Sequence, residues 1–446
     1  MPAAPADSAI YRDLFGDAET AALFTDSAEV RAMLLVEGAL ARVQGALGLI
    51  PAEAAALIDR AAREVQIDPA VLAPEAARNG VPVPGLLAAF RKAAEAPEPM
   101  RWLHWGATSQ DIVDTALALR LRRVLDLWEV RLTALIAALG QLAEAHADLA
   151  MAARTYGQAA TPSTFGAQVA SWGRPLLRHR DRLHGLRNDV MQVSLSGAAG
   201  TLSAMGETGP QVRSALAEAL GLSDPGAGWH SERDGMAAFG AWMAGLTATL
   251  GKIGEDLILL TSTGLNEVRI AGAGGSSTMP QKQNPVGPSV LVALARQVIG
   301  LSATLTGAGL HRQARDGAAW FTEWLTLPQM CISTGRALEL AGDLAMRVQP
   351  NPVAMSRVLE ADAGTIHAEA LTFALSARMP RPEAEAAVKR LCAKALDSGI
   401  DLRTLAARDW PDLPVPTALG EAPAEARAFA AAARAPESSR TPARSL

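Results

Sequence analysis

The stretch LRRVLDLWEVRLTALIAALGQL, residues 121–142, decides the fold. Its apolar side chains recur every three or four residues, at Leu121, Val124, Leu125, Trp128, Leu132, Leu135, Ile136, Leu139 and Leu142. That spacing puts them on one face of an α-helix and persists for about six turns. The stretch therefore predicts a long amphipathic helix whose apolar face packs against other helices.

The same helical spacing recurs along the chain. It predicts further long helices over 165–190, 235–263, 288–310 and 320–348. Alternating β-branched stretches, which are typical of strands, are almost absent. Proline at position 175 is expected to kink the first of these helices.

These segments predict an all-α fold built around an elongated central bundle of long helices. We expect three parts: an N-terminal helical domain over 1–110, the bundle over 111–350, and a C-terminal helical domain over 351–446. Shorter helices are expected before residue 102. Five such long helices exceed what one compact domain usually contains, so other copies of the chain are expected to cover their excess apolar surface.

Composition excludes several classes of protein. The chain has 446 residues, 49% of them hydrophobic and 20% charged, which excludes a disordered protein. A net charge of −5 without a long basic run argues against binding to nucleic acid. Cys331 and Cys392 cannot form a disulfide framework or a zinc site, and are expected to be small buried side chains. No secretory signal or charge-free apolar run of 18 residues is visible, which favours a cytoplasmic protein without a membrane span.

The stretch GGSSTMPQKQNP, residues 274–285, interrupts the helical pattern with two serines, a lysine and an asparagine. Glycines and prolines in this order are common in a plain linker between helices. The functional alternative is a loop whose backbone N–H groups and Lys282 meet one anion. A serine hydroxyl near that positive charge then becomes a candidate for proton transfer.

Two further polar clusters can likewise be interpreted either as ordinary structural segments or as parts of a binding site. The first, HWGATSQD at 104–111, precedes the helix of 121–142; Thr108, Ser109 or Asp111 could simply cap it. A helix N-terminus would also favour a bound carboxylate. The second, RTYGQ at 154–158, could be no more than a loop and a helix cap.

Taken together, these clusters resemble the three separated regions of the fumarase/aspartase superfamily, in the right order. Residues 274–285 contain every fixed position of its signature Gly-Ser-Ser-x-Met-Pro-x-Lys-x-Asn-Pro. The stretch SGAAGT at 196–201 also resembles the superfamily's Gly-Gly-Ala-x-Gly-Thr segment. The resemblance spans about 30–370 and implies addition to, or elimination from, a carbon next to a carboxylate, through an aci-carboxylate intermediate.

The resemblance also implies roles for individual residues. Ser276 would transfer the proton at the α-carbon, with Ser277 as its close rival, and Lys282 would stabilise the charge that develops. The remaining candidates would bind substrate: His104, Thr108, Ser109, Thr155, Tyr156, Gln158, Asn284 and Arg315. The resemblance also implies a homotetramer whose active sites combine the three regions from three different subunits. No metal or organic cofactor is expected, and the seven histidines show no metal-ligand spacing.

Within the superfamily, the chain most resembles the 3-carboxy-cis,cis-muconate cycloisomerase family of protocatechuate degradation. Tyr156 stands where several lyases carry a histidine that serves the leaving group, and an intramolecular addition has no such group. The forms of 104–111 and 274–285, and the Trp-x-x-Glu-Trp stretch at 320–324, match this family. Gln313 and Ala314 replace an expected His-Glu, and Gly264 replaces an expected Glu. The alternatives are a lyase of the adenylosuccinate type and a catalytically silent helical scaffold.

Overall fold

The computed structural model describes residues 4–272, 274–275, 278–413 and 419–435. They form two compact units, each assembled from separated stretches of the chain. Unit 1 comprises Met1–Arg131, His179–Ala248 and Ala293–Glu339; unit 2 comprises Leu132–Arg178, Thr249–Val292 and Leu340–Leu446. The predicted division into three domains follows different boundaries and stays a prediction.

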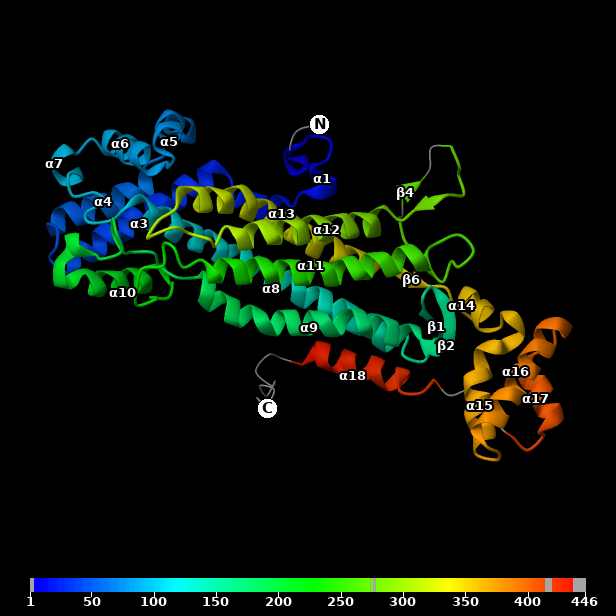
Figure 1. Cartoon of the computed structure of the whole chain (residues 1–446). Helices are drawn as coiled ribbons and strands as arrows, with labels where there is room; N and C mark the ends of the chain where they lie inside the picture. Colours follow the sequence, from blue (N-terminus) through cyan, green and yellow to red (C-terminus); the bar gives the residue numbers. More distant parts are fainter. Residues whose placement is uncertain (1–3, 273, 276–277, 414–418, 436–446) are drawn as a thin grey trace. The chain divides into compact units, whose positions relative to one another are not determined.

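Five long helices form the main part of the described chain (Figure 1). The boundaries of the two units divide each of them, so each contributes residues to both units. They are α8 Ser109–Ala145, α9 Phe165–Val190, α11 Asp234–Leu260, α12 Val286–Gly307 and α13 Gly317–Arg347. The predicted long helices are therefore confirmed, and α9 begins and ends where its apolar spacing predicts. Pro175 lies inside α9, and α13 contains Pro328, which the sequence reading did not consider.

The N-terminal part of unit 1 consists of α1 Arg12–Phe15, α2 Ala18–Ala22, α3 Asp26–Ala46, α4 Ala52–Glu64, α5 Ala73–Asn79, α6 Val83–Ala94, α7 Pro97–Met100 and the 3₁₀ turns η1 Pro5–Asp7 and η2 Pro69–Leu72. The expectation of shorter helices before residue 102 is wrong for α3, which has 21 residues. The Thr25 hydroxyl caps α3 by accepting the Ala28 N–H. Unit 1 also contains η3 Ser203–Thr208 and α10 Gly209–Leu220.

Helices α3 and α4 lie side by side because small residues line their contact (Figure 1). A Cβ atom on Gly38 would lie 2.7 Å from the Cβ of Ala62, and one on Gly45 only 2.3 Å from that of Ala55. Glycine is thus required at both positions for this close approach. Apolar residues of α3, α4, α6, α10 and the start of α8 then form one continuous core.

Unit 2 contains all the described strands, paired in three short antiparallel hairpins or ladders. The pairs are β1 Ala150–Thr155 with β2 Gln158–Thr164, β3 Val268–Ile270 with β6 Val348–Pro350, and β4 Gly274–Gly275 with β5 Gln283–Asn284. The strands are brief interruptions in a helical chain, so the all-α prediction is confirmed.

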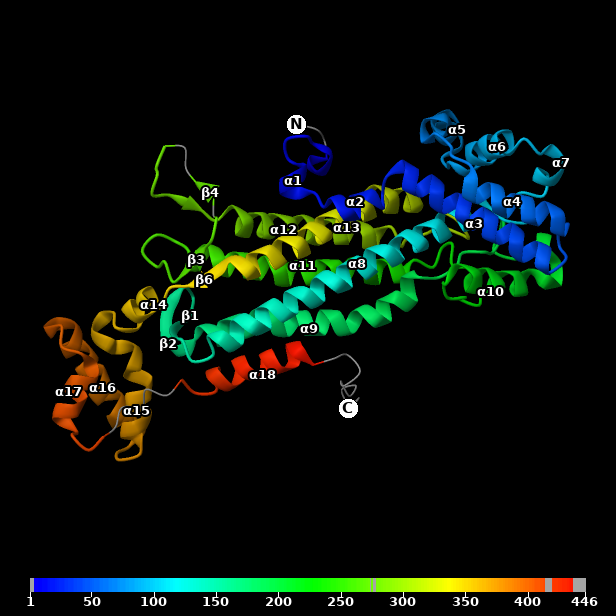
Figure 2. The same ribbon diagram turned by 180° about the vertical axis from the view of Figure 1, so that it is seen from behind.

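The C-terminal helices of unit 2 are α14 Pro352–Leu359, α15 Ala368–Ser376, α16 Arg381–Ser398, α17 Leu402–Asp409 and α18 Ala422–Arg434, with the 3₁₀ turn η4 Asp362–His367. Both views show α15, α16 and α17 packed together (Figures 1 and 2). Leu371, Leu391 and Leu405 are among the buried residues of their own small core.

One helix of the described chain, α12, is long and apolar enough to cross a membrane by length and composition. Only 33% of its most apolar window is buried. Core helices of soluble proteins meet the same criteria, so α12 alone is weak evidence for a membrane span.

Candidate active site

The first polar region is anchored by Asp111, a fully buried residue in the first turn of α8. Its carboxylate accepts hydrogen bonds from the backbone N–H groups of Thr108, Ser196 and Gly197, at 2.9 to 3.0 Å. The Nε2 atom of His230 lies 2.8 Å from the same carboxylate. Asp111 therefore joins the first region to the stretch 196–201, and its role is structural. His230 was not among the residues predicted from the sequence, because no motif surrounds it.

Arg315 belongs to the same cluster in unit 1. Its Nε donates to Oε1 of Gln110 at 3.0 Å, and Nη2 donates to the carbonyl of Ala198 at 3.3 Å. The residue as a whole stays exposed. The structure thus brings Arg315 together with Gln110 of the first region and Ala198 of the stretch 196–201.

A buried ionic network supports this cluster from within unit 1. Arg233 donates to both carboxylate oxygens of Asp114 and both of Glu323, and the indole N–H of Trp320 donates to Asp114 at 3.1 Å. Although burial alone would lower the pKa of Arg233, the two carboxylates raise it above its usual value. Burial raises the pKa of Glu323, and Arg233 opposes that rise. Gln110 donates to Asp114 at 3.1 Å and so connects the network to Arg315.

His104 lies in a strained turn before α8. Its backbone has a φ of +67°, and Gly106, two residues later, has a φ of +73°. Its Nδ1 lies 2.6 Å from Oε1 of Glu37 on α3. Trp105 between them is exposed, with its ring 4.8 Å from that of Trp102, so aromatic surface adjoins the histidine.

The second polar region is a β-hairpin, so the alternative of a loop and helix cap does not describe it. Thr155 ends β1 and pairs with Gln158, which begins β2. Tyr156 and Gly157 form the turn, and both have positive φ, +51° and +77°, as a two-residue type I′ turn requires. All four residues are exposed, Tyr156 completely. The sequence signal for this turn was the glycine in the second central position.

The signature stretch begins and ends in a paired strand. Gly274 pairs with Asn284 and Gly275 with Gln283, so β4 and β5 hold the two ends of the stretch together. Lys282 is exposed and Asn284 half-buried. Ser276 and Ser277, the predicted proton-transfer candidates, lie outside the described residues.

A buried ion pair in unit 2 escaped the sequence reading. Arg154 Nη1 lies 2.6 Å from Oε2 of Glu267, with side chains 10% and 0% exposed. Within the described chain, neither carboxylate oxygen of Glu267 has an aligned hydrogen-bond donor. Arg154 also lines a cavity of about 200 Å³ beside Gly157, Gln168 and Lys252. The second region therefore adjoins a buried ion pair whose carboxylate lacks hydrogen-bond donors within the described chain.

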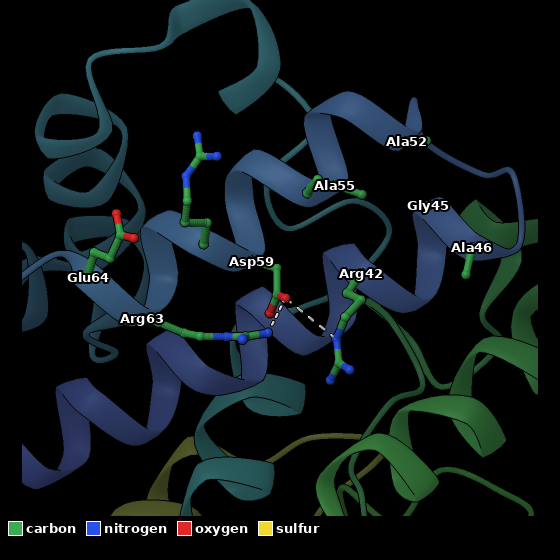
Figure 3. A pocket seen from close by; sticks show the side chains of 10 residues that line it. Arg42, Gly45, Ala46, Ala52, Ala55, Asp59, Arg63 and Glu64 are labelled. Carbon is green, nitrogen blue, oxygen red and sulfur yellow. Dashed lines mark hydrogen bonds and ion pairs between the residues drawn. The ribbon is translucent and has the colours of Figure 1, made fainter.

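The cavity between α3 and α4, about 450 Å³, is a different feature (Figure 3). Asp59, one of the residues that line it, forms ion pairs with both Arg42 and Arg63. None of the predicted site residues lines it. No cluster of three or more possible metal ligands occurs among the residues that the structure describes.

Comparison with known proteins assigns the family. A family model described as Lyase matches residues 12–300. The chain belongs to the fumarase/aspartase superfamily. Among its relatives in this superfamily, the 3-carboxy-cis,cis-muconate cycloisomerase of Pseudomonas aeruginosa is 39% identical over 401 residues, covering 89% of this chain and 87% of the relative.

Another superfamily member, trans-aconitate decarboxylase 1 of Mycosarcoma maydis, is 35% identical over 86% of this chain and 78% of its own length. Among solved structures, the 3-carboxy-cis,cis-muconate lactonizing enzyme from Pseudomonas putida superposes with a TM-score of 0.89 at 34% identity. That alignment covers 96% of this chain and 99% of the other. The resemblance read from the sequence is therefore confirmed.

Proposed function

We propose that the chain is a cycloisomerase that converts 3-carboxy-cis,cis-muconate to a carboxymuconolactone. The observation that carries the proposal is its similarity to cycloisomerases along nearly the whole chain, at 37–39% identity in three of them. This evidence favours the cycloisomerase over an adenylosuccinate-type lyase or a silent scaffold. As a metabolic enzyme of this kind, it would act in the cytoplasm.

The reaction is an addition within one molecule. A carboxylate oxygen of the substrate attacks a carbon of the conjugated double bond and closes a five-membered lactone. Because the nucleophile is tethered, its effective concentration is high without a second substrate. The electron pair moves to the carbon next to another carboxyl group, giving an aci-carboxylate. A proton then adds to that α-carbon and completes the isomerisation.

Each group of site residues has a task in this scheme. Lys282 and Asn284 stabilise the doubly charged carboxyl group of the intermediate, where fixed donors and cations contribute most. Ser276 delivers the proton, with Ser277 as the alternative donor. Arg315 binds a carboxylate of the substrate through the planar guanidinium that Gln110 and Ala198 hold in place.

Thr108, Ser109, Thr155, Tyr156, Gln158 and His104 complete the substrate contacts. In the hairpin, Tyr156 replaces a histidine that serves leaving groups in related lyases, and ring closure expels no group. On a single chain, Tyr156 is completely exposed and Lys282 is exposed. This exposure supports an active site to which other subunits contribute residues. We therefore propose a homotetramer with shared active sites, needing neither metal nor organic cofactor.

The first experiment mixes purified protein with 3-carboxy-cis,cis-muconate and records the loss of diene absorbance. The substrate carries three carboxylates and the lactone two, so each turnover near neutral pH should take up one proton, which a pH-stat measures. Trans-aconitate and adenylosuccinate serve as parallel substrates. Rapid diene loss with one proton consumed supports the cycloisomerase; turnover of trans-aconitate instead would overturn it.

Two variants test the residue roles. Ser276→Ala should lower kcat at least 100-fold while leaving the oligomer size unchanged, because it removes a proton-transfer group. Lys282→Met should raise KM and lower kcat together, since its charge serves both substrate and intermediate. Lys389→Met, at an exposed position of α16, is the matched control and should behave as the wild type. Full activity of Ser276→Ala would move the role to Ser277.

A further inference from the structure

Helix α3 presents two side chains to the turn that carries His104. Glu37 faces the imidazole, and Gln44, seven residues later on the same helix face, donates its amide N–H to the carbonyl of Trp105 at 2.7 Å. One contact orients the ring and the other fixes the backbone beside it. A non-glycine residue with positive φ persists only where surrounding contacts over-determine it, as they do for His104.

Glu37 is buried in a way that demands a counter-charge. Its side chain is 0% exposed and that of His104 is 15% exposed. Within the described chain, His104 is the one ion-pair partner of Glu37, and Oε2 of the carboxylate accepts no hydrogen bond. An ionised carboxylate away from water is stable only when a positive group compensates it.

The surrounding charges favour the protonated ring. Burial alone would lower the pKa of His104, but Glu37 on α3 outweighs it and Asp111 on α8 adds to the rise. Arg91 on α6 opposes them, and the net effect raises the pKa above its usual value. With Nδ1 turned toward Glu37, Nε2 is the ring nitrogen that remains for a ligand.

We propose that Glu37 is a positioning residue that holds His104 as an imidazolium, whose Nε2–H binds one carboxylate of the substrate. The identity of the substrate rests on the proposed function, whereas the Glu37–His104 pair can be tested without any substrate. The histidine then contributes a fixed positive charge, and its partner on α3 decides the pH at which that charge is lost.

The direct test is an NMR titration of histidine side chains in ¹³C-labelled protein. The chain has seven histidines, and His104→Gln identifies the signal of His104 by its disappearance. In wild type, His104 should titrate above the ordinary value of about 6.5. In Glu37→Gln, which keeps the shape and a hydrogen-bond acceptor, it should titrate below that value because burial then dominates. An unchanged pKa in Glu37→Gln would overturn the proposal.

The control is Asp17→Asn, which removes another buried carboxylate of unit 1, one paired with Arg131. It should leave the pKa of His104 as in wild type, separating the specific pair from general loosening of the fold. If Glu37→Gln does not fold, the wild-type titration still decides, because a His104 pKa at or below 6.5 contradicts the imidazolium.

Kinetics then test the contact with substrate. At pH 7.5, Glu37→Gln should raise KM about tenfold to 100-fold, the worth of a charged hydrogen bond, with a smaller change in kcat. The difference in KM between Glu37→Gln and wild type should become smaller toward pH 6, where His104 of the variant regains its proton. A KM ratio that does not vary with pH would refute the carboxylate contact even if the NMR result holds. Absence of wild-type turnover would overturn the proposed function and leave the NMR test intact.

Discussion

Replacing Arg233 with methionine removes a cation that two buried carboxylates share. Arg233 and Glu323 are 1% exposed and Asp114 is 0% exposed, so no solvent can replace the lost charge. The guanidinium makes hydrogen bonds to all four carboxylate oxygens. The variant therefore leaves two like charges facing each other in the interior.

The expected loss of stability is large. Removing one partner of a buried ion pair costs about 3–5 kcal/mol. Arg381→Met is a matched control, because it breaks the ion pair with Glu385 on the surface of α16, where both side chains are more than half exposed. Such an exposed pair contributes about 0–1 kcal/mol. Both substitutions replace arginine with methionine. The difference between their losses of stability therefore reports the effect of burying the ion pair.

The loss of stability in Arg233→Met should also depend on pH. The titration of Glu323 decides whether it grows or shrinks as the pH rises. Burial raises the pKa of this carboxyl, and without Arg233 the pKa rises further. A carboxyl with a raised folded-state pKa binds its proton more tightly in the folded protein. Its contribution to stability is thus complete below the unfolded value of about 4.3 and is lost as pH rises through the folded value. The Arg233→Met variant should therefore have its lowest free energy of unfolding at high pH.

Urea unfolding followed by tryptophan fluorescence measures both effects, at pH 5, 6.5 and 8 and one protein concentration. The midpoint of Arg233→Met should fall well below that of Arg381→Met, and the gap should widen from pH 5 to pH 8. Equal midpoints for the two variants, or a gap independent of pH, would refute the reasoning about buried charge.

Three further results are expected. Gly173→Ala should lower the melting temperature, equivalent to about 1–3 kcal/mol, because a Cβ there would lie 1.9 Å from Cζ of Phe429; Gly185→Ala on the same helix has open space and should be neutral or stabilising in the same thermal scan. A thiol reagent should leave Cys331 unmodified in native protein and react slowly at Cys392, since burial raises the pKa of both thiols; fast labelling of Cys331 would contradict its complete burial. Gly157→Val should weaken the β1–β2 hairpin and raise KM, because β-branched residues disfavour φ of +77°, with Gly185→Ala again as the control; an unchanged KM would exclude the hairpin tip from the site.

The long helices were predictable because the signal for each lies within its own segment, as apolar residues repeated at helical spacing over many turns. The hairpins were not, because β4 and β5 have two residues each, too few for an alternating pattern. In β1 and β2 the alanine-rich sequence has low strand propensity, and pairing with each other decides their structure.

The site divides in the same way. Its signature stretches are contiguous in sequence and so could be recognised, whereas the residues that support them are distant. Glu37 lies 67 positions from His104, and Arg233 lies 119 from Asp114. Each looks like an ordinary polar residue in its own segment. Only the folded chain shows which charges are buried together, and burial determines what those charges do.

Gly264 shows how a departure from the family pattern can be read physically. Its φ of +95° lies where glycine is strongly favoured, and its carbonyl accepts a hydrogen bond from Arg357 at 2.8 Å. A glutamate side chain is thus replaced by a backbone turn. Three residues later, Glu267 supplies a fully buried carboxylate directly beside Arg154 of the second region. The chain has therefore lost one expected acidic side chain in this segment, while a negative charge remains in contact with the second region.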